Sequence, residues 1–352
     1  MNLFEMMEWS NWKKLTDEAM LQVVGKVLMY FVSPLKLVTD IRLMDFELAG
    51  VKCRTAELEI DGDPFVFVPG NQEAILGWDL GVEGLNATTW APPFPEEKSL
   101  LTQQLITEFG LETEEQWDQF VNLYTTPLRK VAICPMLVEK YALPAGTRYL
   151  GDLDTVTGEF TGDMGKFAPA EAEVRQLFAP PASFEESLNF TLPKQAEVGE
   201  NYYVELAEDL ESYHVFERRF QTQEEIIKGI RKEGFRLLTE DQWEYVVGGG
   251  TRRLFRWGHD LDNDDSYWGR QVKGYLCANN MFGIYVDDRL QRYEITRENH
   301  LKLDCWQPTG IPLLDFLPMA TYYRAPRQLD AKEKLSLENF SYRRGVVIDP
   351  KR

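Results

Sequence analysis

Apolar residues recur at helical spacing near the N-terminus. Between residues 15 and 32 they lie three or four positions apart, at Met20, Val23, Val24, Val27, Leu28 and Phe31. This spacing places them on one face of a helix over residues 15–32. Ser33-Pro34 ends that helix, because proline has no amide hydrogen and restricts the residue before it. We expect the helix to pack on the main domain, and a surface for a partner is the alternative.

Short apolar segments separated by turn residues follow this helix. Residues 37–68 predict two or three strands, and the segment Asp61-Gly-Asp63 supplies one of the turns between them. Residues 99–109 and 113–124 predict helices, and residues 131–138 predict a buried strand. The order of short strands and short helices favours a mixed architecture over an all-helical one.

A further helix is expected directly after Thr239. Gln242 lies three residues beyond Thr239, which is the arrangement of a capping box. Trp243 and Val246 give this helix an apolar face. Three glycines, Gly248 to Gly250, then end it, since glycine enters the left-handed backbone region without a steric cost.

Residues 151–200 have the least regular pattern of the chain. They combine many acidic residues with several glycines and prolines. We interpret them as a long surface insertion with little secondary structure, and such a loop can carry a binding site. Together with the elements above, the chain predicts an α+β fold with much irregular structure.

The composition fits a folded globular protein and excludes two kinds of partner. The 352 residues are 44% hydrophobic, which is enough apolar material for one large domain or two smaller ones. The net charge of −19 repels the phosphate backbone of nucleic acids and anionic membrane surfaces. We therefore expect neither nucleic acid nor a membrane as a partner.

Three further features favour a cytoplasmic protein. No stretch has the unbroken apolar run that a bilayer span requires. The N-terminus lacks the basic, apolar and cleavage segments of a secretory signal. The four cysteines are too few and too scattered for a disulfide scaffold; they are Cys53, Cys134, Cys277 and Cys305.

Four stretches occur in the order that one enzyme family has them. They begin at Phe65 (FVFVPG), Pro127 (PLRKVAICPMLVEKY), Gly234 (GFRLLTEDQWEY) and Ala278 (ANNMFGIY). From about residue 60 to its end, the chain resembles the formylglycine-generating enzyme family, the sulfatase-modifying factor domain. The resemblance implies a C-type-lectin-like fold with few strands, a pair of helices and long loops.

The resemblance also implies how the chain is divided. Residues 1–60 would be an N-terminal extension, consisting of the amphipathic helix and strands, that packs on the main domain. Residues 61–352 would be the formylglycine-generating-enzyme-like domain, and the irregular insertion at about residues 151–200 would lie within it.

One departure from the family decides the expected function. Its active oxidases carry two closely spaced cysteines near the C-terminus, which bind copper and oxidise a substrate cysteine. Here the last cysteine is Cys305, and the next one upstream is Cys277. The resemblance therefore implies a divergent, non-catalytic member that binds a small molecule, a peptide or a protein through its loops. Two alternatives stay open, a metal-dependent oxidase acting through Cys277 and Cys305 and a structural or assembly protein.

The candidate binding residues lie between Trp257 and Tyr285. The acidic segment containing Asp260 and Asp262 follows Trp257 and reads either as a cation-binding loop or as a solvated turn. Aromatic side chains such as Trp257 and Tyr285 either belong to the core or stack on a ligand. We therefore name Trp257, Asp260, Asp262 and Tyr285 as ligand-binding candidates.

A structural calcium ion is implied by the resemblance alone. The segment after Ala278 would supply its ligands, which are Asn280, Ile284 and Asp287. The three histidines of the chain, His214, His259 and His300, are dispersed, so we expect His214 and His259 to be ordinary surface or hydrogen-bonded side chains.

Overall fold

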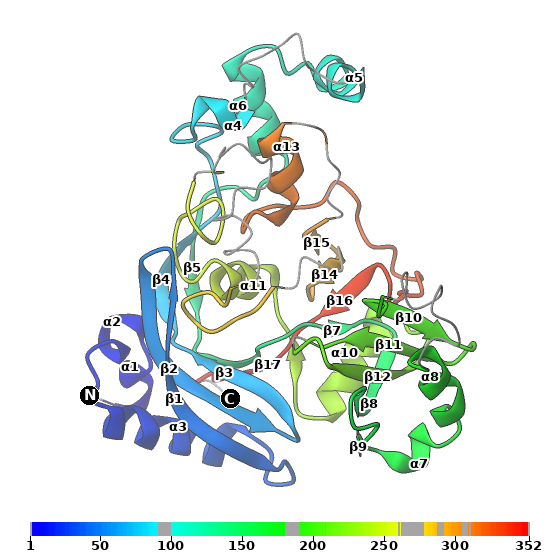
Figure 1. Ribbon diagram of the computed structural model, residues 1–352. Helices are drawn as coiled ribbons and strands as arrows, with labels where there is room; N and C mark the ends of the chain where they lie inside the picture. Colours follow the sequence, from blue (N-terminus) through cyan, green and yellow to red (C-terminus); the bar gives the residue numbers. More distant parts are fainter. Residues whose placement is uncertain are drawn as a thin grey trace. The chain divides into compact units, whose positions relative to one another are not determined.

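The computed structural model describes most of the chain, namely residues 2–90, 100–179, 191–207, 209–259, 261, 278–286, 292–304, 309 and 311–350. The chain forms two compact units (Figure 1). The first unit comprises residues 1–143, 223–333 and 338–352, and the second comprises residues 144–222 and 334–337. The second unit is thus inserted into the chain of the first.

A six-stranded antiparallel sheet forms the centre of the first unit. Its strand order is β1 (Val38–Leu48), β2 (Val51–Ile60), β3 (Asp63–Val68), β6 (Met136–Glu139), β17 (Arg344–Val347) and β13 (Arg236–Leu237). The first three strands form a meander, whereas β6 and β17 join it from distant parts of the sequence, with Val66 opposite Val138 and Val346 opposite Leu137. All four residues from Phe65 to Val68 are fully buried, so both faces of this sheet are covered at its centre.

Helix α3 (Asp17–Phe31) confirms the helix predicted near the N-terminus. The hydroxyl of Thr16 accepts a hydrogen bond from the amide of Ala19 and caps the first turn. Met20, Val23, Val24 and Val27 are buried on one face, and α3 packs against β2. The amphipathic pattern therefore arises because one face of the helix covers the sheet.

Two smaller sheets and several helices complete the first unit. One sheet has the order β15 (Leu301–Lys302), β14 (Tyr293–Ile295), β16 (Phe340–Tyr342) and β7 (Leu143–Pro144), and the chain passes from the first unit to the second at β7. Strands β4 (Asn71–Leu76) and β5 (Arg129–Ile133) pair with each other. The helices are α1 (Leu3–Met6), α2 (Trp9–Trp12), α4 (Ala87–Trp90), α5 (Leu100–Phe109), α6 (Glu114–Leu123), α10 (Gln223–Lys232), α11 (Glu240–Val247), α13 (Pro312–Phe316) and the 3-10 helix η2 (Leu317–Met319).

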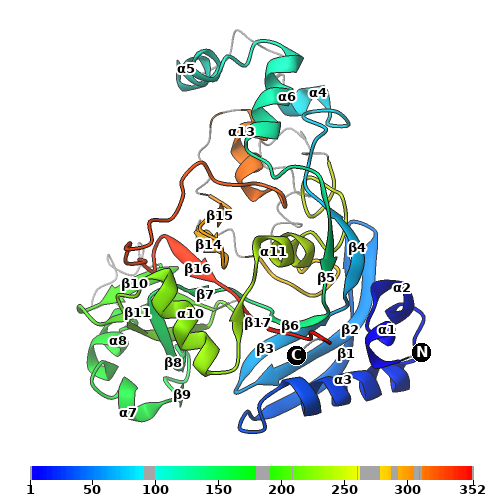
Figure 2. The same cartoon turned by 180° about the vertical axis from the view of Figure 1, so that it is seen from behind.

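The second unit is a five-stranded antiparallel sheet with two helices on one face (Figure 2). Its strand order is β10 (Gln195–Val198), β11 (Tyr202–Leu206), β12 (Ser212–Arg218), β8 (Thr147–Asp154) and β9 (Phe160–Gly162). Helices α7 (Met164–Phe167) and α8 (Glu171–Leu177) contribute Phe167 and Val174 to a core shared with Leu153, Tyr213 and Val215. The unit therefore has a hydrophobic core of its own.

The expectation of little secondary structure in residues 151–200 is corrected by these strands and helices. Gly151 and Gly162, two of the glycines behind that expectation, lie opposite each other on β8 and β9. A Cβ atom on Gly151 would lie 2.3 Å from the carbonyl oxygen of Thr161 and 2.7 Å from the Cα of Gly162. Glycine marks a close approach of two strands here, which a sequence pattern does not distinguish from a turn.

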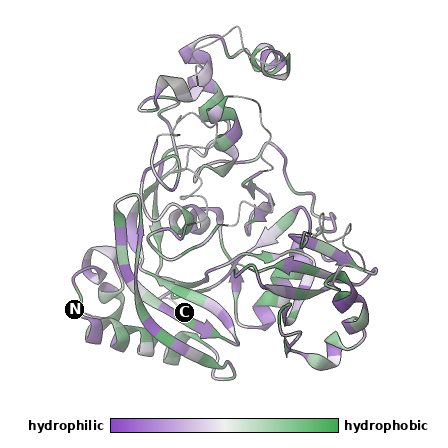
Figure 3. Ribbon diagram, in the orientation of Figure 1, coloured by the Kyte–Doolittle hydropathy of each residue, from purple (hydrophilic) through white to green (hydrophobic). Residues whose placement is uncertain are grey.

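The expected α+β class is confirmed, since helices and several antiparallel sheets occur together. Along the six-stranded sheet, the five-stranded sheet and α3, hydrophobic and hydrophilic residues are interspersed, as expected for elements that cover a core on one side (Figure 3). Within the described parts of the chain, no helix is both long and apolar enough to cross a bilayer.

Candidate functional site

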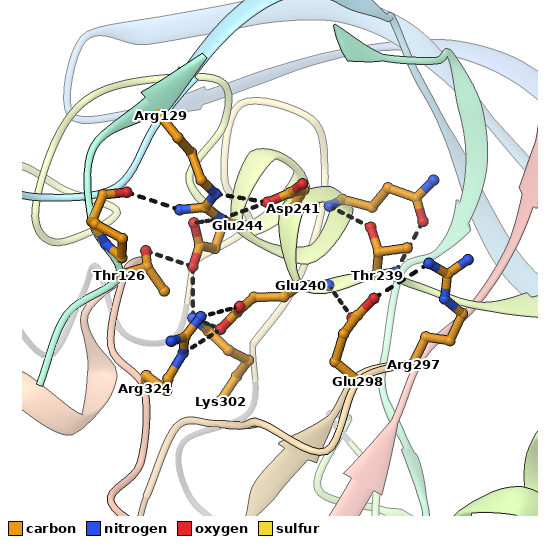
Figure 4. Close-up of polar contacts among 12 residues, drawn as sticks. Thr126, Arg129, Thr239, Glu240, Asp241, Glu244, Arg297, Glu298, Lys302 and Arg324 are labelled. Carbon is orange, nitrogen blue, oxygen red and sulfur yellow. Dashed lines mark hydrogen bonds and ion pairs between the residues drawn. The ribbon is translucent and has the colours of Figure 1, made fainter. Parts of the chain in front are cut away.

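Helix α11 begins with the predicted capping box. The amide of Gln242 donates to the hydroxyl of Thr239 (3.1 Å), and the amide of Thr239 donates back to the Gln242 side chain (2.9 Å). Trp243 is buried against the core, whereas the acidic residues of the helix face a group of basic side chains (Figure 4). We call the acids, the bases and a neighbouring threonine together the α11 cluster. It consists of Thr126, Arg129, Glu240, Asp241, Glu244, Lys302 and Arg324.

Glu244 is the most deeply buried acid of the α11 cluster. One carboxylate oxygen accepts hydrogen bonds from the hydroxyl of Thr126 (2.8 Å) and from Nζ of Lys302 (2.8 Å). The other accepts from Arg129 (2.8 Å). Both Glu244 and Lys302 are fully buried, so each charge depends on the other for its stability.

Glu240 and Asp241, the other two acids of the α11 cluster, also form ion pairs with its bases. Arg324 binds Glu240 through two nitrogens, one of them Nε at 3.0 Å, and Arg129 binds Asp241 at 2.6 Å. Burial acts to raise the pKa of Glu240, but the hydrogen bond from Arg324 and the charges of Lys302 and Arg324 outweigh it, so the pKa of Glu240 is lowered. Three acids, Glu240, Asp241 and Glu244, thus face three bases, Arg129, Lys302 and Arg324.

The α11 cluster fastens separate segments of the first unit to one helix. Its members come from the start of β5, from α11, from β15 and from the segment near residue 324. Backbone hydrogen bonds join the same segments: the amide of Thr126 donates to Tyr322 (2.9 Å) and that of Ala325 to Leu301 (3.0 Å). The charged groups are engaged with one another, which is the arrangement of a positioning network.

A second buried ionic group involves the adjacent residues Arg343 and Arg344. Arg343 pairs with Glu294 (3.0 Å) and donates to the carbonyl of Glu139 (2.9 Å), whereas Arg344 pairs with the carboxylates of Glu139 and Asp63. Arg343 lies between β16 and β17 and Arg344 begins β17, and the two arginines bind different carboxylates. Burial opposes the charge of Arg344, but the Glu139 carboxylate outweighs it, so the pKa of Arg344 is raised. Sequence reasoning missed both groups, because their members lie far apart in the sequence.

Two of the ligand-binding candidates are buried aromatic residues. Trp257 stacks on Phe255 with ring centroids 5.2 Å apart, and Tyr285 contacts the ring of Tyr141 at 5.5 Å. Both belong to the core of the first unit. Asp260 and Asp262 lie outside the described residues, so the grouping of the four candidates stays a prediction.

Asn280 has a structural position that the sequence did not reveal. Its side-chain amide donates to the carbonyls of Val246 (2.6 Å) and Val247 (2.9 Å), which are among the last carbonyls of α11. Its side-chain oxygen accepts from the amides of Phe282 (2.9 Å) and Ile284 (3.0 Å). Asn280 thereby caps α11 and fixes the turn that follows it.

The remaining predicted site residues lie outside the described residues. These are Asp287 of the implied calcium set and the two cysteines, Cys277 and Cys305. Ile284, the third member of the calcium set, is fully buried. Among the residues that the structure describes, no group of three or more histidine, cysteine, aspartate and glutamate side chains is arranged to hold a metal ion.

The second unit carries a different polar group on the sheet face opposite its helices. Glu205, His214 and Asp152 lie directly opposite one another on β11, β12 and β8, and we call them the His214 row. Nδ1 of His214 lies 2.5 Å from a carboxylate oxygen of Asp152. The side chains of His214 and Asp152 are 42% and 43% exposed, so this pair meets solvent, unlike the α11 cluster.

The environment of His214 favours its charged form. Burial acts to lower the pKa of His214, but the hydrogen bond to Asp152 and the charges of Asp152, Glu205 and Asp209 outweigh it, so this pKa is raised. A parallel row of aromatic residues, Tyr203, Phe216 and Tyr149, lies next to the His214 row on the same three strands. His214 is thus a hydrogen-bonded side chain, as expected from the sequence.

The second unit contains a segment that is similar to a known protein family. Residues 148–217 are similar to a family described as a profilin-like domain of unknown function. This segment lies wholly within residues 144–222. No curated protein is similar enough to the chain to count as a relative.

The resemblance to the formylglycine-generating enzyme family is therefore wrong. The similarity that is found belongs to a profilin-like domain, and it falls where the resemblance expected an irregular insertion. The residues on which the resemblance was based have local structural roles, such as the capping box at Thr239 and the buried strand at Phe65. Short signals of this kind occur in many folds, and the lectin-like fold and calcium set lose their support with the resemblance.

Proposed function

We propose that this protein is a non-catalytic binding protein that contacts a partner protein through its inserted second unit. In this proposal the first unit is the scaffold, and its ionic groups position chain segments. The observation that supports the proposal is the insertion of a compact unit, with a core of its own, into the chain of another. Function resides in sites that are added to a scaffold, and an inserted unit is such an addition.

The ends of the insertion lie next to each other within the second unit. Thr147 on β8 is paired with Arg218 on β12, and the amide of Arg219 donates to the carbonyl of Gly146. A unit whose two ends are adjacent can be inserted into a loop of a host without rebuilding the host fold. The second unit therefore suits an added recognition function better than a contribution to the core of the scaffold.

The face opposite α7 and α8 offers the chemistry for such a contact. Tyr149, Asp152 and His214 reach solvent there and combine an aromatic ring, a carboxylate and an imidazole. Aromatic side chains beside a few hydrogen-bonding groups are the usual anchors of protein interfaces. The rings of Tyr203 and Phe216 lie beside these residues on the same face and are buried against Leu337.

Quantitative affinity capture from an extract of the source cells tests the proposal. The immobilised full chain is compared with the variant Tyr149→Ala/Asp152→Asn and with the control Val156→Ala, which changes an exposed residue elsewhere in the same unit. We expect at least one protein to be captured by the wild type and the control but not by the double variant, and to bind the purified chain directly. Identical captured sets for all three proteins would contradict the proposal.

A further inference from the structure

The first unit exposes an unusual amount of apolar surface in one stretch of chain. Six large apolar side chains are exposed within residues 21–41, and Leu35 reaches 93% exposure. The six residues are Leu21, Met29, Tyr30, Leu35, Leu37 and Ile41. They belong to α3, to the start of β1 and to the turn between them, so they do not come from scattered surface positions.

One arginine on β2 links α3 to the edge strand β1 through two ion pairs. Arg54 on β2 binds Asp17 on α3 at 2.7 Å and also binds Asp45 on β1. Leu21 follows Asp17 by four residues and therefore lies on the same side of the helix. Leu28 lies two turns after Leu21 and is on that side as well.

The strand contributes to the same side. Ile41 and Leu43 alternate with Asp45 along β1, so they point to the same face of the sheet as Asp45. An apolar strip thus runs between helix and strand. We call Leu21, Leu28, Ile41 and Leu43, with Met29, Leu35 and Leu37 at one end, the α3–β1 seam.

The edge of the sheet borders the α3–β1 seam. Strand β1 is the first strand of the six-stranded sheet, and β2 is its partner there. A bulge between Thr39 and Arg42, with Asp40 at a φ of 53°, interrupts the regular edge. Bulges of this kind hinder open-ended strand pairing, so a partner on this surface is held by the apolar side chains.

The charge of this stretch differs from that of the rest of the chain. Residues 21–44 hold three bases, Lys26, Lys36 and Arg42, and one acid, Asp40, which gives 3 − 1 = +2 in a chain of net charge −19. Lys36 pairs with Asp61 (2.7 Å) and Arg42 with Glu57 (2.6 Å), so the surface is close to neutral. Two copies of so acidic a chain repel each other, and a nearly neutral surface lets them meet at a small electrostatic cost.

The surface is small for an interface. A helix of 15 residues is about 22 Å long and 10 Å across, and the edge strand β1 beside it adds about 5 Å of width. The turn enlarges the surface, but it stays below the roughly 600 Å² per partner at the lower end of specific interfaces, so we expect a weak dimer.

We propose that the α3–β1 seam is the interface of a homodimer, in which the seams of two copies bury each other around a twofold axis. Such an interface uses the same patch on both copies. The neutral, apolar character of the seam makes it complementary to itself. This inference is independent of the second unit.

Analytical ultracentrifugation of the full chain over the micromolar range tests the proposal. We expect wild type to reach twice the chain mass of 40.8 kDa as its concentration rises. Leu21→Glu on the helix and Ile41→Lys on the strand should each raise the dissociation constant about 30-fold or more, the effect of a central interface residue. The control Leu123→Glu changes an exposed leucine on α6 and should leave the dimer unchanged.

Two results would overturn the proposal. One is a wild-type chain that stays monomeric at every concentration, because then the seam has no second copy as its occupant. The other is a dimer that persists in both seam variants, because then another surface holds the copies together. Both substitutions are at solvent-exposed positions, and circular dichroism checks that each variant is folded before its mass is measured.

Discussion

The α11 cluster and the His214 row both contain carboxylates, but they pair them with different kinds of base. In the α11 cluster, buried acids face lysine and arginine, whose charges do not change near neutral pH. In the His214 row, a half-exposed acid faces histidine, whose charge changes there. The α11 cluster therefore holds segments of the scaffold together at neutral pH, whereas the His214 row is expected to make the stability of its unit depend on pH.

The largest expected effect comes from breaking the buried pair of the α11 cluster. Lys302→Met leaves Glu244 with one basic partner in a fully buried place, which should destabilise the protein by about 3–5 kcal/mol. The free energy of unfolding of the first unit in urea measures this loss. Lys302→Met/Glu244→Met removes both charges and should recover a large part of the stability; an equal loss in the double variant would contradict the pairing.

A glycine pair tests the close approach of β8 and β9 in the second unit. Gly151→Ala places a Cβ against the backbone of Thr161 and Gly162, and we expect a loss of about 3 kcal/mol or more. Gly158→Ala is the matched control, because its nearest neighbour is the movable end of the Arg175 side chain. It should cost only about 1–2 kcal/mol for its positive φ. Thermal unfolding of both variants checks the order, and equal losses would mean that the strands do not approach so closely.

The His214 row predicts a dependence of stability on pH. The pKa of His214 is raised in the folded unit, so its contribution is fully present below the ordinary histidine pKa of 6.5. That contribution is lost as the pH rises through the raised value. We therefore expect the second unit to become less stable from about pH 6 to pH 8, and His214→Gln to remove this slope. NMR titration of the imidazole measures the pKa directly, and a value at or below the ordinary one would contradict the account.

The smallest effect is expected from an exposed ion pair. Lys228 and Glu224 on α10 form a pair at 2.8 Å in which both side chains are mostly exposed. Lys228→Ala should change the stability by less than about 0.5 kcal/mol, since exposed pairs are hydrated and screened. A loss as large as that of Lys302→Met would show that burial does not explain the difference between the two pairs.

Local signals in the sequence predicted local structure correctly. The helix at residues 15–32 and the capping box at Thr239 depend on residues a few positions apart, and the structure contains both. The α+β class followed from the mixture of such elements. The prediction of an irregular segment around Gly151 and Gly162 was wrong, because these glycines allow two strands to approach each other closely.

The ionic groups could not be predicted because their members are far apart in sequence. Thr126 and Glu244 are separated by 118 residues, and Arg344 and Glu139 by 205. Only the fold brings them together. The resemblance to an enzyme family, which is wrong, implied other residues as the site. Asn280 was named for calcium on that basis, whereas its side chain caps α11.

Hydrogen exchange of the full chain, followed by mass spectrometry at about pH 6 and pH 8, tests the contrast between the two groups most directly. After correction for intrinsic exchange rates, the account predicts that β8, β11 and β12 lose protection as the pH rises while α11 keeps it. Glu240 supports this, because its pKa is lowered and its own contribution to stability is lost only at acidic pH. Equal changes in both regions, or a change confined to α11, would contradict the account.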